Sequence, residues 1–139
     1  MSNPIYAFEK ALYARLLGGT ALIARIGGTF IYNTRAAGTP PTKRWVVFQH
    51  NVGTTQHTFT SEWESMVYWV KAVVAGPENI LVAMQIWDEI DALLNGQEVD
   101  ASGDGYRNFA LRREGTMKFV DPDGYVNLGG LYRVYLERQ

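Results

Sequence analysis

The chain has 139 residues, a formal net charge of −1 and no cysteine. This length fits one compact domain, and the lack of cysteine excludes disulfides, thiolate nucleophiles and thiolate zinc sites. Thirteen basic against 14 acidic residues give no whole-chain field that would attract nucleic acid or an anionic membrane. We expect a soluble protein, because no apolar run is long enough for a spanning helix and no signal-peptide pattern opens the chain.

The first 28 residues predict two helices. Asn3 is placed to cap the first helix and Pro4 to begin it, and two adjacent glycines end it. Thr20 is the expected cap of a second, short helix that the pair Gly27-Gly28 ends. The spacing of apolar residues places four side chains on the buried face of the first helix, namely Ile5, Phe8, Leu12 and Leu16.

A strand over residues 29–33 and the strand RWVVFQHN, residues 44–51, should enclose an exposed loop. This loop, Thr34 to Lys43, holds two adjacent prolines, a glycine and three threonines, which favour partly extended, solvent-exposed backbone.

The middle of the chain predicts strands and one long helix. QHTFT, residues 56–60, is β-rich, and residues 66–74 are almost continuously apolar, as in a central strand covered on both faces. After the Gly76-Pro77 break, a helix should run from its cap Asn79 to Leu94, before an Asn-Gly stop. Its expected buried face holds Ile80, Ala83, Trp87, Ile90 and Leu94, with Gln85, Asp88, Glu89 and Ala92 opposite.

The last third predicts a long C-terminal β-hairpin. Residues 109–119 alternate as in a half-buried strand, with Arg113 and Gly115 interrupting the row where a bulge or a functional spot is expected. DPDG is typical of a type I turn, and residues 125–136 return as the second strand. The pair Gly129-Gly130 is where a bend or bulge is expected. The apolar row consists of Phe109, Leu111, Met117 and Phe119.

DASGDG, residues 100–105, has the acids and glycines of a calcium loop. An EF-hand loop that began at Asp100 would need a bidentate glutamate at its twelfth position, where Leu111 stands. A connecting loop built on the turn preferences of Asp, Ser and Gly is therefore favoured.

No catalytic set stands out. His50 and His57 would approach each other across a hairpin through residues 52–55, but two imidazoles make an incomplete metal site. The carboxylate pairs Glu62 with Glu64 and Asp88 with Asp91 are more typical of a solvated strand edge and a solvated helix face. The sequence predicts a protein that is not an enzyme and binds no cofactor.

The aromatic and basic residues suggest an interface instead. The chain has 18 aromatic residues, more than a small core needs, and aromatics with arginines anchor protein interfaces. A solvated loop is the simpler interpretation of the basic residues, while an acidic partner is the functional one. The candidate interface residues are Arg35, Lys43, Arg44, Trp45, Arg112 and Arg113.

The order of elements resembles the small tail terminator, or tail completion, proteins of long-tailed bacteriophages. The resemblance covers nearly the whole chain and rests on IYNTRAAGTPPTKRWVVFQ, MVYWVKAVV, IWDEIDALLNG and FVDPDGYVNLGGLYRVYLE. In that family a strand ends near an "IY" pair, a loop with a proline precedes the strand that RWVVFQ resembles, and the helix ends in an "LLNG"-like stop. Pattern and resemblance together predict one tail-terminator-like α+β domain over residues 1–139. It would have a mixed, mostly antiparallel sheet, two main helices packed against it and the C-terminal β-hairpin.

The resemblance also implies a function without catalysis or cofactor. Such a protein forms a homohexameric ring that caps the tail tube, stops its polymerisation and offers the head–tail joining surface. The implied partners are other copies of the chain, the tail tube protein and the head–tail connector protein, with passing DNA contact in the lumen and no membrane. The implied location is the neck of the virion tail, after assembly in the host cytoplasm. We expect the Thr34 to Lys43 loop and the hairpin at ring or tube contacts.

Two alternatives remain open at this stage. One is another head–tail connector or neck component, which would differ in the neighbour that it binds. The other is a small ligand-binding or metal-dependent α+β domain that uses His50, His57 and nearby carboxylates. A host-encoded binding module is a weaker third.

Overall fold

Three helices and six strands make up the part of the chain that the computed structural model describes, residues 3–36, 38–57, 62–75 and 80–139. The helices are α1 (Pro4–Leu17), α2 (Thr20–Ile26) and α3 (Ile80–Leu94). The strands are β1 (Ile31–Asn33), β2 (Arg44–His57), β3 (Glu62–Ala75), β4 (Tyr106–Asn108), β5 (Arg112–Val120) and β6 (Tyr125–Arg138).

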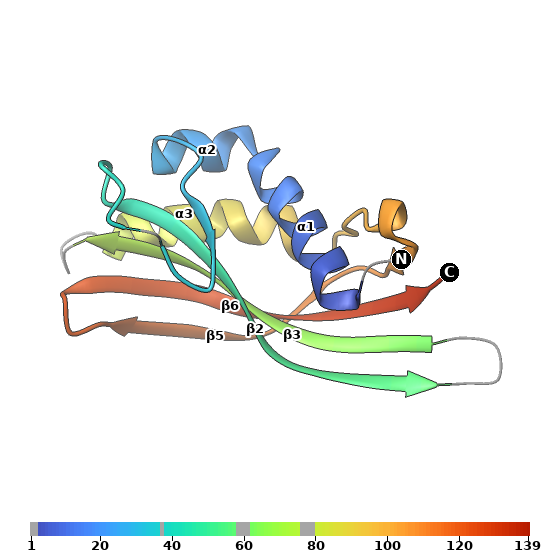
Figure 1. The fold of residues 1–139 in the computed structure, drawn as a ribbon. Helices are drawn as coiled ribbons and strands as arrows, with labels where there is room; N and C mark the ends of the chain where they lie inside the picture. Colours follow the sequence, from blue (N-terminus) through green and yellow to red (C-terminus); the bar gives the residue numbers. More distant parts are fainter. Residues whose placement is uncertain (1–2, 37, 58–61, 76–79) are drawn as a thin grey trace.

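The strands form one open sheet, and all three helices lie on the same face of it (Figure 1). The strand order is β1-β2-β3-β6, and both β4 and β5 pair with the far side of β6. Among the strands of the described residues, only β1 and β2 run parallel. The expected α+β class, with a mostly antiparallel sheet and a C-terminal hairpin, is confirmed.

The helix α1 begins as its sequence predicts. Asn3 Oδ1 accepts a hydrogen bond from the N–H of Tyr6 at 2.8 Å, and Pro4 occupies the first turn. Phe8 and Leu12 are fully buried. The expectation for Ile5 is wrong: its side chain is 43% exposed, because it lies at the rim of the helix face that meets the sheet.

The ends of the other helices are set by glycines. The N-cap of α2 is Gly19, so Thr20 is its first helical residue and not the expected cap. Gly27 ends α2 in the left-handed conformation, at φ 79°, which glycine adopts without strain. The stop after α3 is confirmed, with Gly96 at φ 75°. The predicted QHTFT strand lies partly, and the Gly76-Pro77 break and the Asn79 cap wholly, outside the described residues.

The strand β2 is longer than expected. It runs without interruption to His57, with a register shift against β3 between His50 and Val52. The predicted hairpin through residues 52–55 is wrong, because these residues continue the strand and pair with Ser65, Met66 and their neighbours on β3.

Residues 109–119 do not form one half-buried strand. The strand β5 starts at Arg112, and Met117 and Phe119 remain 36% and 40% exposed because no helix covers their face. The expected bulge between Arg113 and Gly115 is confirmed by a register shift against β6. The residues before the register shift do not continue the in-and-out alternation of β5. The apolar row therefore does not extend to Leu111, which precedes the strand and is buried.

The centre of the sheet is the pairing of β3 with β6. As predicted, β3 is covered on both faces between Met66 and Val74, apart from half-buried Lys71. The pairing shows no bulge at Gly129 or Gly130, so the expected bulge is wrong, while the alternative expectation of a bend stays a prediction. A Cβ atom at Gly129 would lie 2.2 Å from the carbonyl oxygen of Val70, which explains glycine there by close approach of the two strands.

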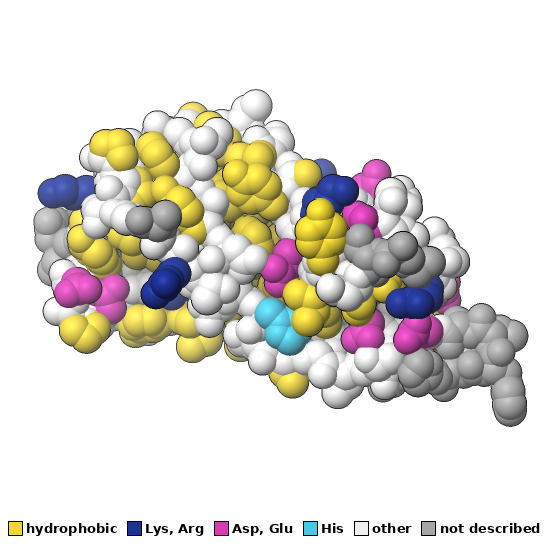
Figure 2. All heavy atoms as spheres, viewed as in Figure 1, with side chains coloured by type: hydrophobic (Ala, Val, Ile, Leu, Met, Phe, Trp, Pro, Cys, Tyr) yellow, Lys and Arg dark blue, Asp and Glu magenta, His cyan; other side chains and the backbone are white. Residues whose placement is uncertain are grey.

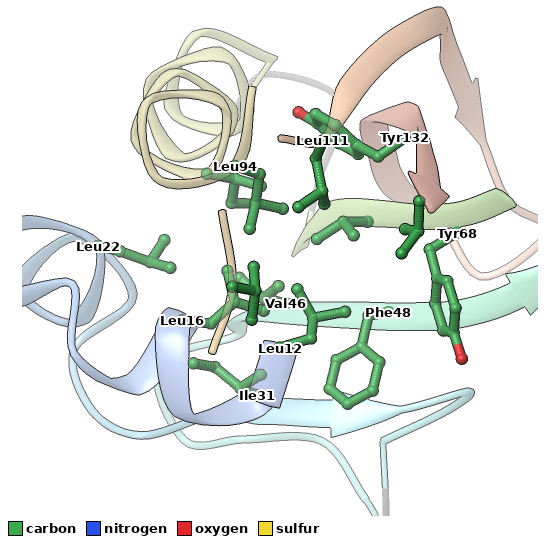
Figure 3. Packing of buried hydrophobic residues seen from close by; sticks show 14 of the residues in the cluster. Leu12, Leu16, Leu22, Ile31, Val46, Phe48, Tyr68, Leu94, Leu111 and Tyr132 are labelled. Atoms are coloured by element: carbon green, nitrogen blue, oxygen red, sulfur yellow. The ribbon is translucent and has the colours of Figure 1, made fainter. Parts of the chain in front are cut away.

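The main core lies between the helices and the sheet (Figure 3). Leu12 and Leu16 of α1 and Leu94 of α3 meet side chains such as Val46 and Tyr68 on the strands. One layer of helices is enough to bury these side chains on a single face of the sheet.

Two buried tyrosines tie the helices to the sheet through polar bonds. The Tyr68 hydroxyl donates to Glu9 Oε2 at 2.7 Å, and the Tyr132 hydroxyl donates to Asp91 Oδ1 at 2.7 Å. Burial, reinforced by the neighbouring carboxylate, raises the pKa of Tyr68 and of Tyr132 above the ordinary value of 10.0.

Replacing Gly129 by alanine should lower the free energy of unfolding by about 1–3 kcal/mol, because the added methyl group meets the β3 backbone. Urea unfolding would measure this. In Gly115→Ala, the matched control, the new Cβ meets only Leu131 at 3.5 Å, and a change within about 0.5 kcal/mol is expected. Equal losses in both variants would contradict the close-approach explanation.

The raised pKa values predict a loss of stability in alkali. Since the folded pKa of Tyr68 and of Tyr132 exceeds the unfolded value, their contribution is complete below about pH 10 and declines as pH rises above it. The free energy of unfolding should fall by at most about 1.4 kcal/mol per pH unit for each tyrosine. Urea midpoints measured against pH should decline less steeply in Tyr68→Phe and Tyr132→Phe. Tyr135→Phe, at a 42% exposed position, should keep the native slope.

Candidate assembly surface

A shallow hollow of 330 Å³ lies on the helix-free face of the sheet, where the loop after β1 meets the tip of the C-terminal hairpin. We call it the hairpin hollow. Residues of the loop and of the hairpin form its walls, and Trp45, Val47 and Val73 form a buried apolar floor. The structure thus brings together the loop and the hairpin, the two segments that the sequence analysis associated with contacts.

Trp45 packs beneath the hairpin hollow. Its ring is 6% exposed and packs edge-on against Tyr125, with the ring centroids 5.4 Å apart. Tyr32 and Ala36 pack against the same cluster from the loop side. Trp45 therefore supports the surface as part of the interior of the chain.

The hairpin turn is held by the carboxylate of Asp121. Asp121 Oδ1 accepts hydrogen bonds from the N–H groups of Asp123 and Tyr125, both at 3.0 Å, and Oδ2 accepts from Asn127 Nδ2 at 3.2 Å. The N–H of Gly124 donates to the Asp121 carbonyl at 2.9 Å, which closes the predicted four-residue turn.

Lys71 is the charged residue that the sequence analysis missed. Its Nζ lies 4.3 Å from the ring centroid of Trp69 and 5.5 Å from that of Phe119. Burial lowers the pKa of Lys71, and the charge of Asp121 partly offsets this. The sequence did contain a signal for Lys71, namely a lysine inside an almost continuously apolar run. The alternation of side chains along a strand places this lysine on the face opposite the main core.

Arg35, Lys43 and Arg112 are exposed, as is Arg113. Arg35 lies in the wall of the hairpin hollow, Lys43 stands at the end of the loop with φ 54°, and Arg112 begins β5. Within the described residues, no ion pair is formed by these three side chains.

The other two arginines point toward the helix side of the sheet. Arg44 Nη1 donates to the carbonyl of Arg25 at 3.3 Å, while Arg113 Nη1 lies 2.8 Å from Asp91 Oδ2, with its guanidinium 5.2 Å from the ring of Trp87. The basic residues therefore do not form one patch.

The interpretation of Asp88 and Asp91 as a solvated pair is wrong for Asp91. This carboxylate binds both Tyr132 and Arg113, and so it joins α3 to the sheet. Glu89, placed on the solvent face by the helical pattern, forms an ion pair with Arg25 of α2 at 3.1 Å. Helical spacing gave no signal for either contact, since both partners come from distant segments.

The two histidines are far apart. His50 and His57 lie on the one strand β2, at a separation of about 20 Å from the rise of an extended chain. The Nε2 atom of His50 is buried without a hydrogen bond, and its ring packs edge-on against Tyr68. Within residues 3–36, 38–57, 62–75 and 80–139, no group of three His, Asp or Glu side chains could hold a metal ion.

DASGDG forms a connecting loop, as predicted. Asp100 Oδ1 accepts hydrogen bonds from the N–H and the hydroxyl of Ser102 at 3.0 and 2.6 Å, and a 3-10 turn over Ser102–Asp104 follows. These hydrogen bonds lower the pKa of Asp100. Asp104 lies 3.4 Å from Lys10 of α1, which connects the loop to the helix layer.

None of the helices that the structure describes is long and apolar enough to cross a membrane.

Replacing Asp121 by alanine should lower the free energy of unfolding by about 1.5–3 kcal/mol, because two backbone N–H groups lose a charged acceptor. Thermal or urea unfolding would measure the loss. Asp123→Ala, in the same turn, is the control, since that side chain is exposed and the change should stay within about 0.5 kcal/mol. Similar losses in the two variants would show that the Asp121 bonds do not hold the turn.

No protein-family model and no curated protein matches the sequence. Among solved structures, a chain in "Virion of native gene transfer agent (GTA) particle" aligns with a TM-score of 0.76 at 14% identity, over 93% of both chains. A second solved structure, whose name is only a sequence identifier, aligns with a TM-score of 0.59 at 15% identity, over 99% of this chain and 97% of that one. At such low identity, the comparisons show that the fold is shared over nearly the whole chain.

Proposed function

We propose that this protein is a structural component of a phage-like particle, and that it forms the ring that terminates the tail tube and joins the tail to the head. The observation that carries the proposal is the fold shared with a chain of a gene transfer agent virion, over 93% of each chain. The element order that resembles phage tail terminators supports the finer role. The partners would be other copies of the chain, the tail tube protein and the head–tail connector protein, and the location would be the neck of the virion.

The surface fits assembly better than chemistry. The hairpin hollow is shallow and is built from a loop and a hairpin tip, with exposed Arg35 in its wall, while the exposed residues Lys43 and Arg112 lie outside it. We propose that these three residues make contacts, while Arg44, Trp45 and Arg113 hold the segments that carry them. The near-neutral chain gives DNA in a ring lumen neither strong attraction nor strong repulsion.

A connector or other neck component is the alternative within the same class. It would share the fold and the ring symmetry and would differ only in the neighbour that it binds. The backbone separation of His50 and His57 along β2 gives the metal-dependent alternative no support within the described residues.

Light scattering across a concentration series, followed by negative-stain imaging, tests the ring. We expect a closed species of about 94 kDa, six times the 15.6 kDa of the chain, since heterologous contacts that close give rings. Purified tail tubes should then stop elongating when this species is added. A strict monomer at every concentration, with no effect on tube growth, would overturn the proposal. Rings that bind a connector and leave tube growth unchanged would favour the alternative.

A further inference from the structure

The sheet has two long backbone edges that nothing covers in the described part of the chain. One edge is β5, which is exposed at all but one of its nine residues and pairs only with β6. The other is the end of β2 beyond β1, which we call the β2 arm, residues 51–57; β1 pairs only with Val46, Val47 and Phe48. Free strand edges are templates for pairing with another strand.

The backbone groups at the β5 edge follow from the ladder. The N–H of Asp121 donates to the Tyr125 carbonyl, so the odd-numbered residues after the bulge face β6. Thr116, Lys118 and Val120 therefore direct their N–H and C=O groups away from the sheet. Their side chains lie on the helix side, in register with Val126 and Leu128.

The same argument applies to the β2 arm. The N–H of Ala75 donates to the Lys43 carbonyl, so the odd-numbered residues of β2 before the register shift direct their backbone groups toward β3. The register shift between His50 and Val52 reverses this alternation. The backbone N–H and C=O groups of Gly53 and Thr55 therefore point away from β3. Their side chains also lie on the helix side, since Gly53 is in register with buried Met66. The β2 arm and β5 run in opposite directions, so the edges of two equally oriented copies meet as an antiparallel pair.

The charges disfavour pairing of two β5 edges. Glu62 and Glu64 lie on β3, one strand in from the β2 arm, and Glu62 is paired with Arg138. The strand β5 carries Arg112, Arg113 and Lys118, and its one acid, Glu114, is paired with Arg133. Figure 2 shows acidic side chains, with a basic side chain beside them, at the right, over the region where Figure 1 places the ends of β2 and β3. Pairing β5 with β5 would bring the basic residues of both copies together, whereas pairing β5 with the β2 arm places them on the side where Glu64 lies one strand further in. Like charges across strands are destabilising.

Exposed apolar side chains would also meet at the joint. Phe119 and Met117 project from the helix-free face of β5, and Val52, 54% exposed, projects from the same face of the β2 arm. Adjacent strands bring such side chains into contact, which removes them from water.

We propose that copies of this chain join head to tail by pairing the β5 edge of one copy with the β2 arm of the next, which makes one continuous sheet. This inference rests on the proposed ring and names the contact that closes it. Each copy contributes four full strands, which together span about 19 Å across the sheet. If Thr55 of one copy pairs with Thr116 of the next, successive copies are displaced by roughly 20 Å along the strand direction. That offset tilts the strands by about 46° from the ring axis, close to the range of closed barrels. Pairing Thr55 with Val120 would tilt them by roughly 60°, well outside it.

Cysteine cross-linking tests the joint, because the chain has no cysteine of its own. Thr55→Cys and Thr116→Cys variants are mixed in equal amounts, oxidised mildly and separated on a non-reducing gel. We expect a covalent species of twice the chain mass in the mixture and in neither variant alone. Lys118→Cys replaces Thr116→Cys in a second mixture, which detects a pairing displaced by two residues. Thr54→Cys is the matched control: it is exposed on the same strand but on the opposite face, so it should give no product with Thr116→Cys.

The outcomes separate this contact from the proposed function. A closed ring by mass, with no product from Thr55→Cys in either mixture, would overturn the edge pairing and leave the ring intact. Covalent products from open chains that never close would support the edge pairing and overturn the ring. A monomer without products would overturn both. Product from a single variant alone would show that like edges pair, which contradicts the proposal.

Discussion

The unbroken antiparallel pairing of β3 with β6 is the constraint on which the rest of this structure depends. It runs from Trp63 opposite Glu137 to Ala75 opposite Tyr125 without a register shift. The strands approach closely enough at Gly129 that a methyl group would meet the backbone of β3. Because this pair is fixed, β1 and β2 must lie on one side and β4 and β5 on the other. The register also decides which side chains face the helices and which face the open side.

Placing every helix on one face has consequences for the other face. The helix face buries the main core and is pinned by the bonds of Tyr68 to Glu9 and of Tyr132 to Asp91. In the described part of the chain, the opposite face is covered where the loop after β1 and the hairpin turn pack on Trp45. Further along it, the Lys71 ammonium lies over the rings of Trp69 and Phe119. A half-covered sheet of this kind is suited to contacts with further protein.

The two ends of the sheet differ in a way that suits directional assembly. Glutamates lie on β3 beside the β2 arm, and β5 carries arginines and a lysine, so β5 meets less charge repulsion at the β2 arm of another copy than at a second β5. Heterologous contacts of this kind build rings or filaments, and the offset between the edges sets which one forms. The fold itself is shared with a chain of a gene transfer agent virion.

The sequence by itself determined the elements whose signals are local. The Asn3 cap, most of the apolar spacing of α1 and α3, the turn at Asp121 and the apolar run of β3 were predictable, since each depends on neighbours within a few residues. The tertiary structure alone decided which polar side chains pair and which apolar ones stay exposed. Asp91 meets Tyr132 from across the fold, β2 continues through residues that were expected to turn, and Phe119 faces the side that no helix covers. These outcomes depend on strand register and on the placement of the helix layer, which arise from contacts between distant segments and leave no period in the sequence.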